Sequence, residues 1–400
     1  MTEVELRVEL VSERSAIPLS AERWNALAAA NEINTVFQTY EWFDAWWRAF
    51  GASRRLYFLV VWRADEIVGF APLTLRRSPF GWRLLEFAGA GNADYLDFIT
   101  PTDKPRQLAA ICRFLRARRS GWERLALYNV PANSSTHDAL LEASGETGLR
   151  VVDEIRVNCP ALALGPDSST ARAMIGKYSL RRPLNWFRKH GEIRFRHVAT
   201  LEEVINFLPV FFEQHRRRWN SVGKYSLFSE ARQRSFYEAL ARTLHARGWL
   251  QFSVVEFNGE PIAFHFGFDY DGCVTWYKPT FATQYAEHSP GLLLTRELIA
   301  DALQRARREI DFTIGDEMFK GRFSSHQRYN LNFGVYPSAF SGACAAALRE
   351  LRRLAGRMLR GLRGANGANG ARVPVPVSAP APTHEVALLE PDAVTERGPT

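Results

Sequence analysis

The clearest chemical feature of the sequence is a helix start suited to holding a phosphate. Ser289 fits the N-cap position, and Pro290 fits the first helical position, where its missing N–H costs nothing. We expect the main-chain N–H groups of Gly291, Leu292 and Leu293 to point out of the helix unpaired. Gly291 also has no side chain to block a close approach. This end of the helix is predicted to bind an anion, typically a phosphate.

Side chains that could accept a proton are clustered in the same stretch of chain: His265, Asp269, Tyr277, His288, Asp316 and Glu317. Asp316 is the favoured general base, because it follows a strand end and Gly315 allows a sharp turn there; a loop carboxylate is also a common cap. Lys320 could neutralise a phosphate or a carboxylate, or pair with Glu317 or Asp316. No Ser/His/Asp or Cys/His set stands out, so a covalent intermediate on a side chain has no support, and nothing suggests a metal.

The elements that position these residues form a meander followed by a helix and a strand. Leu250–Phe257 is β-rich, Asn258-Gly259 is a hairpin turn signal, and strands are predicted at Pro261–Tyr270 and Val274–Lys278. The amphipathic helix that begins at Ser289 comes next. Ile310–Ile314 then alternates as a short strand.

The same order of elements occurs earlier in the chain. Leu56–Phe70 lines up with Leu250–Phe264, and each is followed by a helix (Pro105–Arg118; Gly291–Arg308) and a strand (Leu125–Val130; Ile310–Ile314). The sequence therefore predicts an α/β (α+β) fold built from two copies of one unit. The first helix begins Thr102-Asp103-Lys104-Pro105, and the charge of Asp103 repels an anion, so the second copy should hold the cofactor.

Three motifs resemble the BioF2-like, CelD/BcsL acetyltransferase group of the GNAT superfamily, which is related to the Fem aminoacyl transferases. They are Ser289-Pro290-Gly291-Leu292-Leu293-Leu294, the strand Asp311-Phe312, and the ending Gly315-Asp316-Glu317-x-x-Lys320. The group commonly has Tyr where this chain has Phe319, and often Trp where it has Phe323. A phenolic hydroxyl is therefore absent at position 319. The resemblance implies two tandem acetyltransferase-like domains, each a mixed, mainly antiparallel sheet flanked by helices.

The resemblance also assigns roles to residues. Acyl transfer from a thioester needs a held pyrophosphate, hydrogen-bond donors at the carbonyl, and a group that takes the acceptor's proton. The helix start at Ser289, Pro290, Gly291, Leu292 and Leu293 would supply the first. By resemblance, main-chain amides of the strand Val274–Lys278 would supply the second, near Thr275 and Trp276. The catalytic candidates are Asp316, Tyr277, His265 and Lys320.

Three functions fit this reading. The first is an acyl-CoA-dependent N- or O-acyltransferase, with acetyl as the favoured group, acting on a sugar, lipid, cell-envelope or exopolysaccharide precursor. The second keeps the fold but takes its acyl group from aminoacyl-tRNA, as the Fem relatives do. The third is a non-catalytic partner in polysaccharide biosynthesis. Acetyl-CoA or another acyl-CoA is the expected co-substrate, with no metal.

The charge surplus of +8 in this 400-residue chain is concentrated in two segments. Lys177–Arg196 is either a solvated face or a surface for a polyanionic acceptor or the 3′-phosphate region of coenzyme A. Residues 341–363 read as a basic amphipathic helix, in which Arg349–Arg363 could dock on the protein or contact an anionic membrane. Residues 364–400 are expected to be disordered.

The remaining features set the domain organisation and the compartment. We expect an N-terminal domain at 1–165, with a degenerate cofactor site, and a C-terminal domain at 166–340 with the acyl-CoA site. The aromatic stripe Trp42–Phe50 is either core or a stacking surface, and Asp94-Tyr95 could line the acceptor cleft. The four cysteines are far apart, the chain starts with acidic residues, and no apolar run approaches ~18 residues. We therefore expect a cytoplasmic protein that is at most peripheral to the membrane.

Overall fold

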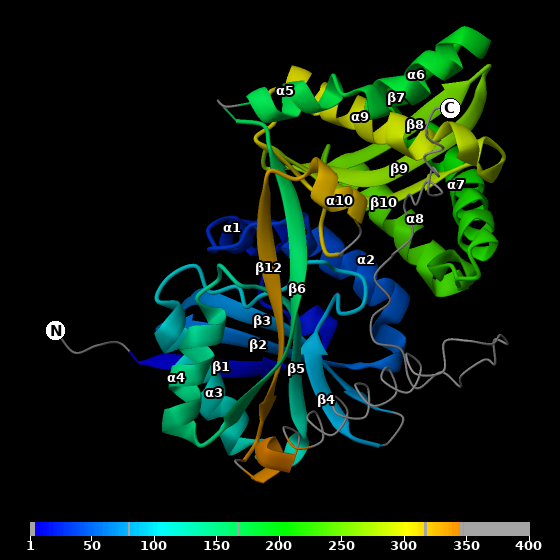
Figure 1. The fold of residues 1–400 in the computed structure, drawn as a ribbon. Coiled ribbons are helices and arrows are strands. Elements are labelled where there is room, and N and C mark those ends of the chain that lie inside the picture. The colour runs from blue at the N-terminus through cyan, green and yellow to red at the C-terminus, as the bar shows by residue number, and fades with distance from the viewer. Residues whose placement is uncertain are drawn as a thin grey trace, which may run out of the picture. The chain divides into compact units, whose positions relative to one another are not determined.

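The computed structural model describes residues 5–78, 81–165, 168–315, 318–338, 340–344 and 347. These residues divide into two compact units. Unit 1 contains the described residues up to Val157 and those from Tyr329 onward, and unit 2 contains those from Asn158 to Arg328. Figure 1 shows the course of the chain through both units.

Unit 1 is built on a mixed sheet in the order β1-β2-β3-β4-β5-β12-β6. Its strands are β1 (Leu6–Val11), β2 (Arg55–Arg63), β3 (Glu66–Arg77), β4 (Arg83–Phe87), β5 (Arg124–Pro131), β12 (His326–Tyr336) and the first part of β6 (Arg150–Ala163). Its helices are α1 (Ala21–Ala29), α2 (Tyr40–Phe50), α3 (Lys104–Ala117) and α4 (Thr136–Thr147), with 3-10 turns η1 (Arg14–Ala16), η2 (Val36–Gln38), η3 (Gly51–Ser53) and η4 (Arg119–Gly121). The aromatic stripe on α2 is core, because Trp42, Phe43 and Trp46 are buried.

Unit 2 continues from the second part of β6 in the order β6-β11-β10-β9-β8-β7. Its strands are β7 (Ile193–His197), β8 (Leu250–Phe257), β9 (Glu260–Tyr270), β10 (Cys273–Phe281) and β11 (Glu309–Asp311). Its helices are α5 (Ser169–Ile175), α6 (Tyr178–His190), α7 (Leu201–Ser221), α8 (Ala231–Ala246), α9 (Pro290–Gln304) and α10 (Met318–Phe323), with 3-10 helices η5 (Leu227–Ser229) and η6 (Thr283–His288).

The predicted hairpin in unit 2 is confirmed. Phe257 pairs with Glu260 across the turn, and both turn residues have positive φ, 51° at Asn258 and 82° at Gly259. A two-residue turn with positive φ at both positions matches the twist of the strands it joins. The antiparallel meander β8-β9-β10 follows from it.

The predicted duplication is also confirmed. The series β2-β3-β4-α3-β5 repeats as β8-β9-β10-α9-β11, and in each copy the last strand pairs parallel with the third. Both helices follow a residue in the left-handed conformation, Asp103 (φ 51°) in unit 1 and Ser289 (φ 55°) in unit 2. The described residues therefore form an α+β fold of two similar units with mixed sheets.

Helices cover both faces of the unit 2 sheet (Figure 1). Apolar side chains of α5, α6 and α9 pack on one face with Val274, Trp276 and Ile310. Aromatic side chains of α7 and α8 pack on the other face against Phe264, Phe266 and Tyr277. We refer to these as the α9 face and the α8 face.

The C-terminal predictions lie largely outside the described residues. Residues 340–344 and 347 are helical, but the rest of the predicted basic helix at 341–363 and the tail at 364–400 are not described. Within the described chain, no helix combines the length and the apolar character needed to cross a membrane.

Candidate functional site

Strand β10, which leads through a loop into helix α9, parts from its neighbour β11 well before it ends. Strands β10 and β11 pair only between Cys273–Thr275 and Glu309–Asp311, after which β11 ends and β10 continues to Phe281. The chain between these two strands is the loop 282–289 and α9 itself. Beyond Thr275, β10 therefore has no ladder partner among the described residues on the side where β11 stops.

The start of α9 differs in detail from the prediction. Pro290 does occupy the first helical position, but Ser289 has φ 55° and ψ 55° and its side chain makes no capping bond. An N-cap side chain reaches the first-turn amides from an extended backbone, which Ser289 does not have. The N–H groups of Leu292 and Leu293 donate to the Ser289 carbonyl at 3.0 and 3.2 Å, so the expectation that both are unpaired is wrong.

One main-chain donor remains at this helix start. Among the described residues, no hydrogen-bond acceptor faces the N–H of Gly291. Pro290, Gly291 and Leu293 are buried, whereas Ser289 and Leu292 are half-buried. The helix start is therefore partly covered, and it offers an anion one N–H and the positive end of the helix dipole.

An aromatic stack and a basic helix adjoin this start. His288, which directly precedes Ser289, stacks on Trp186 of α6 with ring centroids 3.4 Å apart, and His190 stacks on Trp186 at 4.2 Å. The exposed cations of α6 have no carboxylate partner in the described part of the chain: Arg181, Arg182, Arg188 and Lys189. By contrast, Arg216 and Arg217 on α7 both pair with Glu213. The α6 surface thus keeps an unneutralised positive charge beside α9.

Strand β10 carries a bulge just after its paired segment. Thr275 pairs with Phe268 and Lys278 with Phe266, so Trp276 and Tyr277 lie opposite the single residue Gly267. The N–H of Tyr277 donates to Nε2 of His265 at 3.3 Å. The Thr313 hydroxyl donates to the carbonyl of Trp276, also at 3.3 Å. The strand predicted to face the thioester is thus irregular where β11 leaves it.

His265 is buried beside this bulge. Its ring stacks on Trp276 with centroids 5.0 Å apart, and it has no exposed surface. Burial, with the nearby His197, lowers the pKa of His265 to about 3, and the Thr275 backbone opposes this only in part. The ring is therefore neutral at ordinary pH. Its Nε2 accepts the Tyr277 N–H, and no hydrogen-bond partner of the buried Nδ1 lies among the described residues.

The other sequence candidates on β10 are buried as well. Thr275, Trp276 and Tyr277 are 6%, 3% and 3% exposed. On the α8 face, the Tyr237 hydroxyl donates to the Tyr277 hydroxyl at 3.1 Å. Tyr277 thus has its phenol in a buried tyrosine pair.

The segment after β11 is described in part. Gly315 has φ 145°, as the expected sharp turn requires, and its N–H donates to the Asn158 carbonyl. Asp316 and Glu317 lie outside the described residues, and so does the side chain of Phe319. Lys320 is buried and donates from Nζ to the Ile314 carbonyl at 2.7 Å.

Two side-chain groups emerge that the sequence did not reveal. Ser253 Oγ lies 2.9 Å from His197 Nδ1, and His197 Nε2 lies 2.9 Å from Asp301. Ser253 has no exposed surface, so this serine cannot reach a substrate as a nucleophile. His197 and Ser253 pair across β7 and β8, so a correct prediction of that strand pairing would have brought these two residues together.

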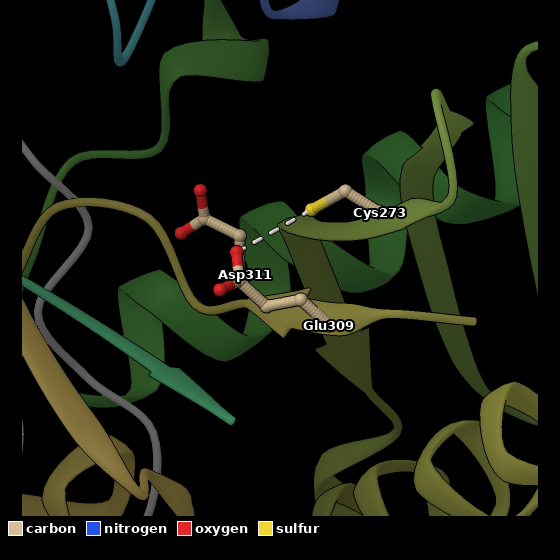
Figure 2. A group of neighbouring side chains, drawn as sticks. All are labelled: Cys273, Glu309 and Asp311. Carbon is tan, nitrogen blue, oxygen red and sulfur yellow. Dashed lines mark hydrogen bonds between the residues drawn. The ribbon is translucent and has the colours of Figure 1, made fainter. Parts of the chain in front are cut away.

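The second group is Cys273, Glu309 and Asp311, whose ligand atoms lie within 4.8 Å of one another (Figure 2). Arg328 contacts Glu309 at 2.8 Å and Asp311 at 2.9 Å, and its single positive charge offsets part of the charge of the two carboxylates. Burial, and then the charges of Asp311 and Glu309, raise the pKa of the Cys273 thiol well above its usual range. Because both carboxylates already pair with Arg328, the cluster is an ion-paired strand end in the described chain.

Unit 1 fills the corresponding helix start with its own side chains. Lys104 is buried at the start of α3, and its ammonium contacts Asp97 at 2.9 Å and Glu32 at 3.1 Å. Glu32 also accepts hydrogen bonds from the N–H and hydroxyl of Ser135. Burial raises the pKa of Glu32, but the Ser135 bonds and Lys104 outweigh it and lower it to about 2. The pair Asp94 and Tyr95 is buried in the same unit.

Comparisons with known proteins agree with this geometry. Residues 176–321 match a family model described as "Acetyltransferase (GNAT) domain". No curated protein matches the chain. The chain resembles the crystal structure of FemX at 10% identity and a TM-score of 0.57, covering 80% of this chain and 96% of that one. A conserved protein of unknown function from Bacteroides thetaiotaomicron gives 11% identity and a TM-score of 0.53, covering 82% and 100%.

A tandem GNAT protein from the clavulanic acid biosynthesis pathway is also similar, at 12% identity and a TM-score of 0.47, covering 84% and 99%. At these identities, the likeness to FemX and to the Bacteroides protein shows a shared fold. The predicted α+β class with two similar units is confirmed.

Proposed function

We propose that the protein is an acyl-CoA-dependent N- or O-acyltransferase, on the premise that residues 176–321 form an acetyltransferase (GNAT) domain. The observation that carries this proposal is the start of α9, which follows β10 in the chain after β10 and β11 have parted. It offers the N–H of Gly291 and the positive end of the helix dipole, and the preceding His288 stacks on Trp186 of α6, a helix with exposed cations. These groups suit the phosphates of a coenzyme A carrier.

The remaining parts of the reaction are assigned to the neighbouring strand and loop. Main-chain N–H groups of the β10 segment around Thr275 and Trp276 would polarise the thioester carbonyl. Asp316 stays the preferred general base, since it follows the turn at Gly315, and Lys320 holds that turn through the Ile314 carbonyl. Tyr277 and His265 are less suited to proton transfer, because both are buried and each is bonded to a neighbour.

Unit 2, and not unit 1, is proposed to hold the acyl carrier. In unit 1 the carboxylates of Asp97 and Glu32 already pair with Lys104 at the start of α3, and Asp103 pairs with Arg63 and Arg106. An incoming phosphate would have to compete with these carboxylates for the cations there. Unit 1 is therefore proposed to serve the acceptor, with a sugar, lipid, cell-envelope or exopolysaccharide precursor as the substrate class.

A transferase that uses aminoacyl-tRNA is the second candidate. The unpaired cations on α6 favour it, because exposed cations without carboxylate partners bind polyanions such as RNA. A non-catalytic role in polysaccharide biosynthesis would need neither donor. The basic segment Arg349–Arg363 is proposed as a peripheral contact to an anionic membrane, on the cytoplasmic side.

The proposal is tested by Ser289→Asp, with Ser289→Asn as the matched control. Asp103 shows that aspartate adopts the left-handed conformation at this kind of helix start, and asparagine adopts it as readily. A carboxylate near the first turn stabilises the helix but repels a phosphate. Two unit charges about 5 Å apart at an effective dielectric constant of about 20 repel by roughly 3 kcal/mol before screening.

The measurement is calorimetric titration with acetyl-CoA. We expect Ser289→Asp to weaken binding by about ten- to a hundredfold and Ser289→Asn by less than about threefold. Equal affinities for the two variants would place the phosphates elsewhere. If the unaltered protein does not bind acetyl-CoA, the acyl-CoA assignment fails, and titration with aminoacyl-tRNA then decides between the two alternatives.

A further inference from the structure

Side chains from both sides of β10 form hydrogen bonds with the backbone of its bulge. His265, on the adjoining strand β9, accepts the N–H of Tyr277, and Thr313, just after β11, donates to the carbonyl of Trp276. A bulge takes residues out of the regular ladder and re-aims the chain locally. The two side chains therefore set the direction of the main chain where β10 is left without β11.

The histidine itself is held in one position. Its ring lies against Trp276 on one side and occupies the space next to Gly267, where an added Cβ would come within 1.9 Å of Cε1. Only a residue without a side chain leaves this space for the ring. An imidazole confined in this way has few other orientations for its Nε2 lone pair.

The His265 imidazole is neutral and buried, so it serves as a hydrogen-bond acceptor and not as a general base. His265 is fully buried, and the low pKa that burial gives it keeps the imidazole neutral at ordinary pH. The basic nitrogen already accepts the Tyr277 N–H. A general base would need a free lone pair within reach of the acceptor's proton.

We propose that His265 is a positioning residue, whose Nε2 holds the Tyr277 N–H and so fixes the β10 bulge in the direction from which the main chain at Thr275 and Trp276 donates a hydrogen bond to the acyl carbonyl. The proposal rests on the proposed function, because it needs a thioester bound along β10. In this proposal, a buried histidine on β9 determines how the main-chain N–H donors of β10 are oriented. Electrostatic stabilisation of this kind depends on donors held in place before the reaction begins.

The test uses the full chain with three substitutions at one position and one control. His265→Gln keeps an acceptor that can reach the Tyr277 N–H, His265→Asn has one that is too short, and His265→Leu has none. Ser253→Ala removes another fully buried polar group, at the residue that pairs with His265 on β8, and leaves the bulge untouched. Circular dichroism shows which variants fold.

The readout is the ¹³C signal of acetyl-CoA labelled at the carbonyl carbon, measured with the ligand fully bound. A hydrogen bond to the carbonyl moves this signal downfield, whatever the affinity. We expect a clear downfield movement with the unaltered protein and with Ser253→Ala, most of it with His265→Gln, and less than half with His265→Leu and His265→Asn. If His265→Leu does not fold, the comparison of His265→Gln with His265→Asn decides.

The outcomes separate the two proposals. An unchanged bound signal in His265→Leu or His265→Asn would overturn the role of His265 while leaving acyl-CoA binding in place. A loss of equal size in Ser253→Ala would show that any buried polar group in the sheet has this effect, and would also overturn it. No binding by the unaltered protein would instead refute the proposed function, and the role of His265 with it.

Discussion

Replacing His265 with glutamine should make unit 2 less sensitive to acid. Burial lowers the pKa of His265 from 6.5 to about 3, so the unfolded chain binds a proton that the folded chain excludes between these two values. The contribution of His265 to stability is therefore highest above pH 6.5 and falls as the pH drops toward 3. Glutamine does not titrate, so this loss should vanish in the variant.

The size of the effect follows from the two pKa values. One proton taken up only by the unfolded chain lowers the free energy of unfolding by about 1.4 kcal/mol for each pH unit. From about pH 7 to about pH 4.5, a shift from 6.5 to about 3 gives a loss of roughly 2.5 kcal/mol in the unaltered protein. Groups that do not interact with His265 contribute equally in both proteins and cancel in the difference.

The assay is urea unfolding followed by tryptophan fluorescence, since Trp276 contacts the ring. The difference in unfolding free energy between the unaltered protein and His265→Gln is compared near pH 7 and near pH 4.5. Ser253→Ala keeps His265 and should show the same acid loss as the unaltered protein. A difference that does not change with pH would refute the reasoning, because His265 could then not be a buried neutral acceptor.

Three further predictions address other parts of the chain. Lys104→Met should lower the unfolding free energy of unit 1 by roughly 3–5 kcal/mol in denaturant, because it leaves the buried Asp97 without its cationic partner. The double variant Lys104→Met, Asp97→Asn should regain much of the lost stability, and a loss below about 1 kcal/mol in the single variant would contradict the prediction. In the native protein at pH 8, a thiol reagent should modify the exposed Cys344 first and spare Cys112, since burial raises the pKa of that thiol to about 12; fast reaction of two or more thiols would count against this. A chain truncated at Gly342 should float less with anionic liposomes than the full chain if Arg349–Arg363 contacts membranes, and equal flotation would exclude that contact.

Much of the fold could be predicted because its signals are local. The Asn258-Gly259 turn and the strands around it follow from residues that are adjacent in sequence. The duplication follows from the alignment of Leu56–Phe70 with Leu250–Phe264, and both segments do form matching hairpins. A hydrophobic pattern with the period of a strand or a helix can be read from the sequence without knowing which residues pack against it.

Details of the site depended on contacts that no local pattern encodes. Ser289 has the residue type of an N-cap, but its left-handed backbone removes that role. The bulge at Trp276 and Tyr277 requires a partner from β9, and the ion pair of Glu309 requires Arg328, which comes later in the chain. The roles of Asp316 and Glu317 stay predictions from sequence, since both residues lie outside the described chain.

The close approach of the His265 ring to Gly267 couples two positions that cannot vary independently. Alanine at 267 would collide with the imidazole and also with the Thr275 carbonyl oxygen, 2.6 Å from the added Cβ, so a smaller side chain at 265 would not by itself make room for it. A homologue that retains the ring must therefore retain the glycine, and one that has lost the ring still has the Thr275 carbonyl against that position. The joint presence of both residues in a distant sequence would identify a strand built in the same way, even where little else is shared.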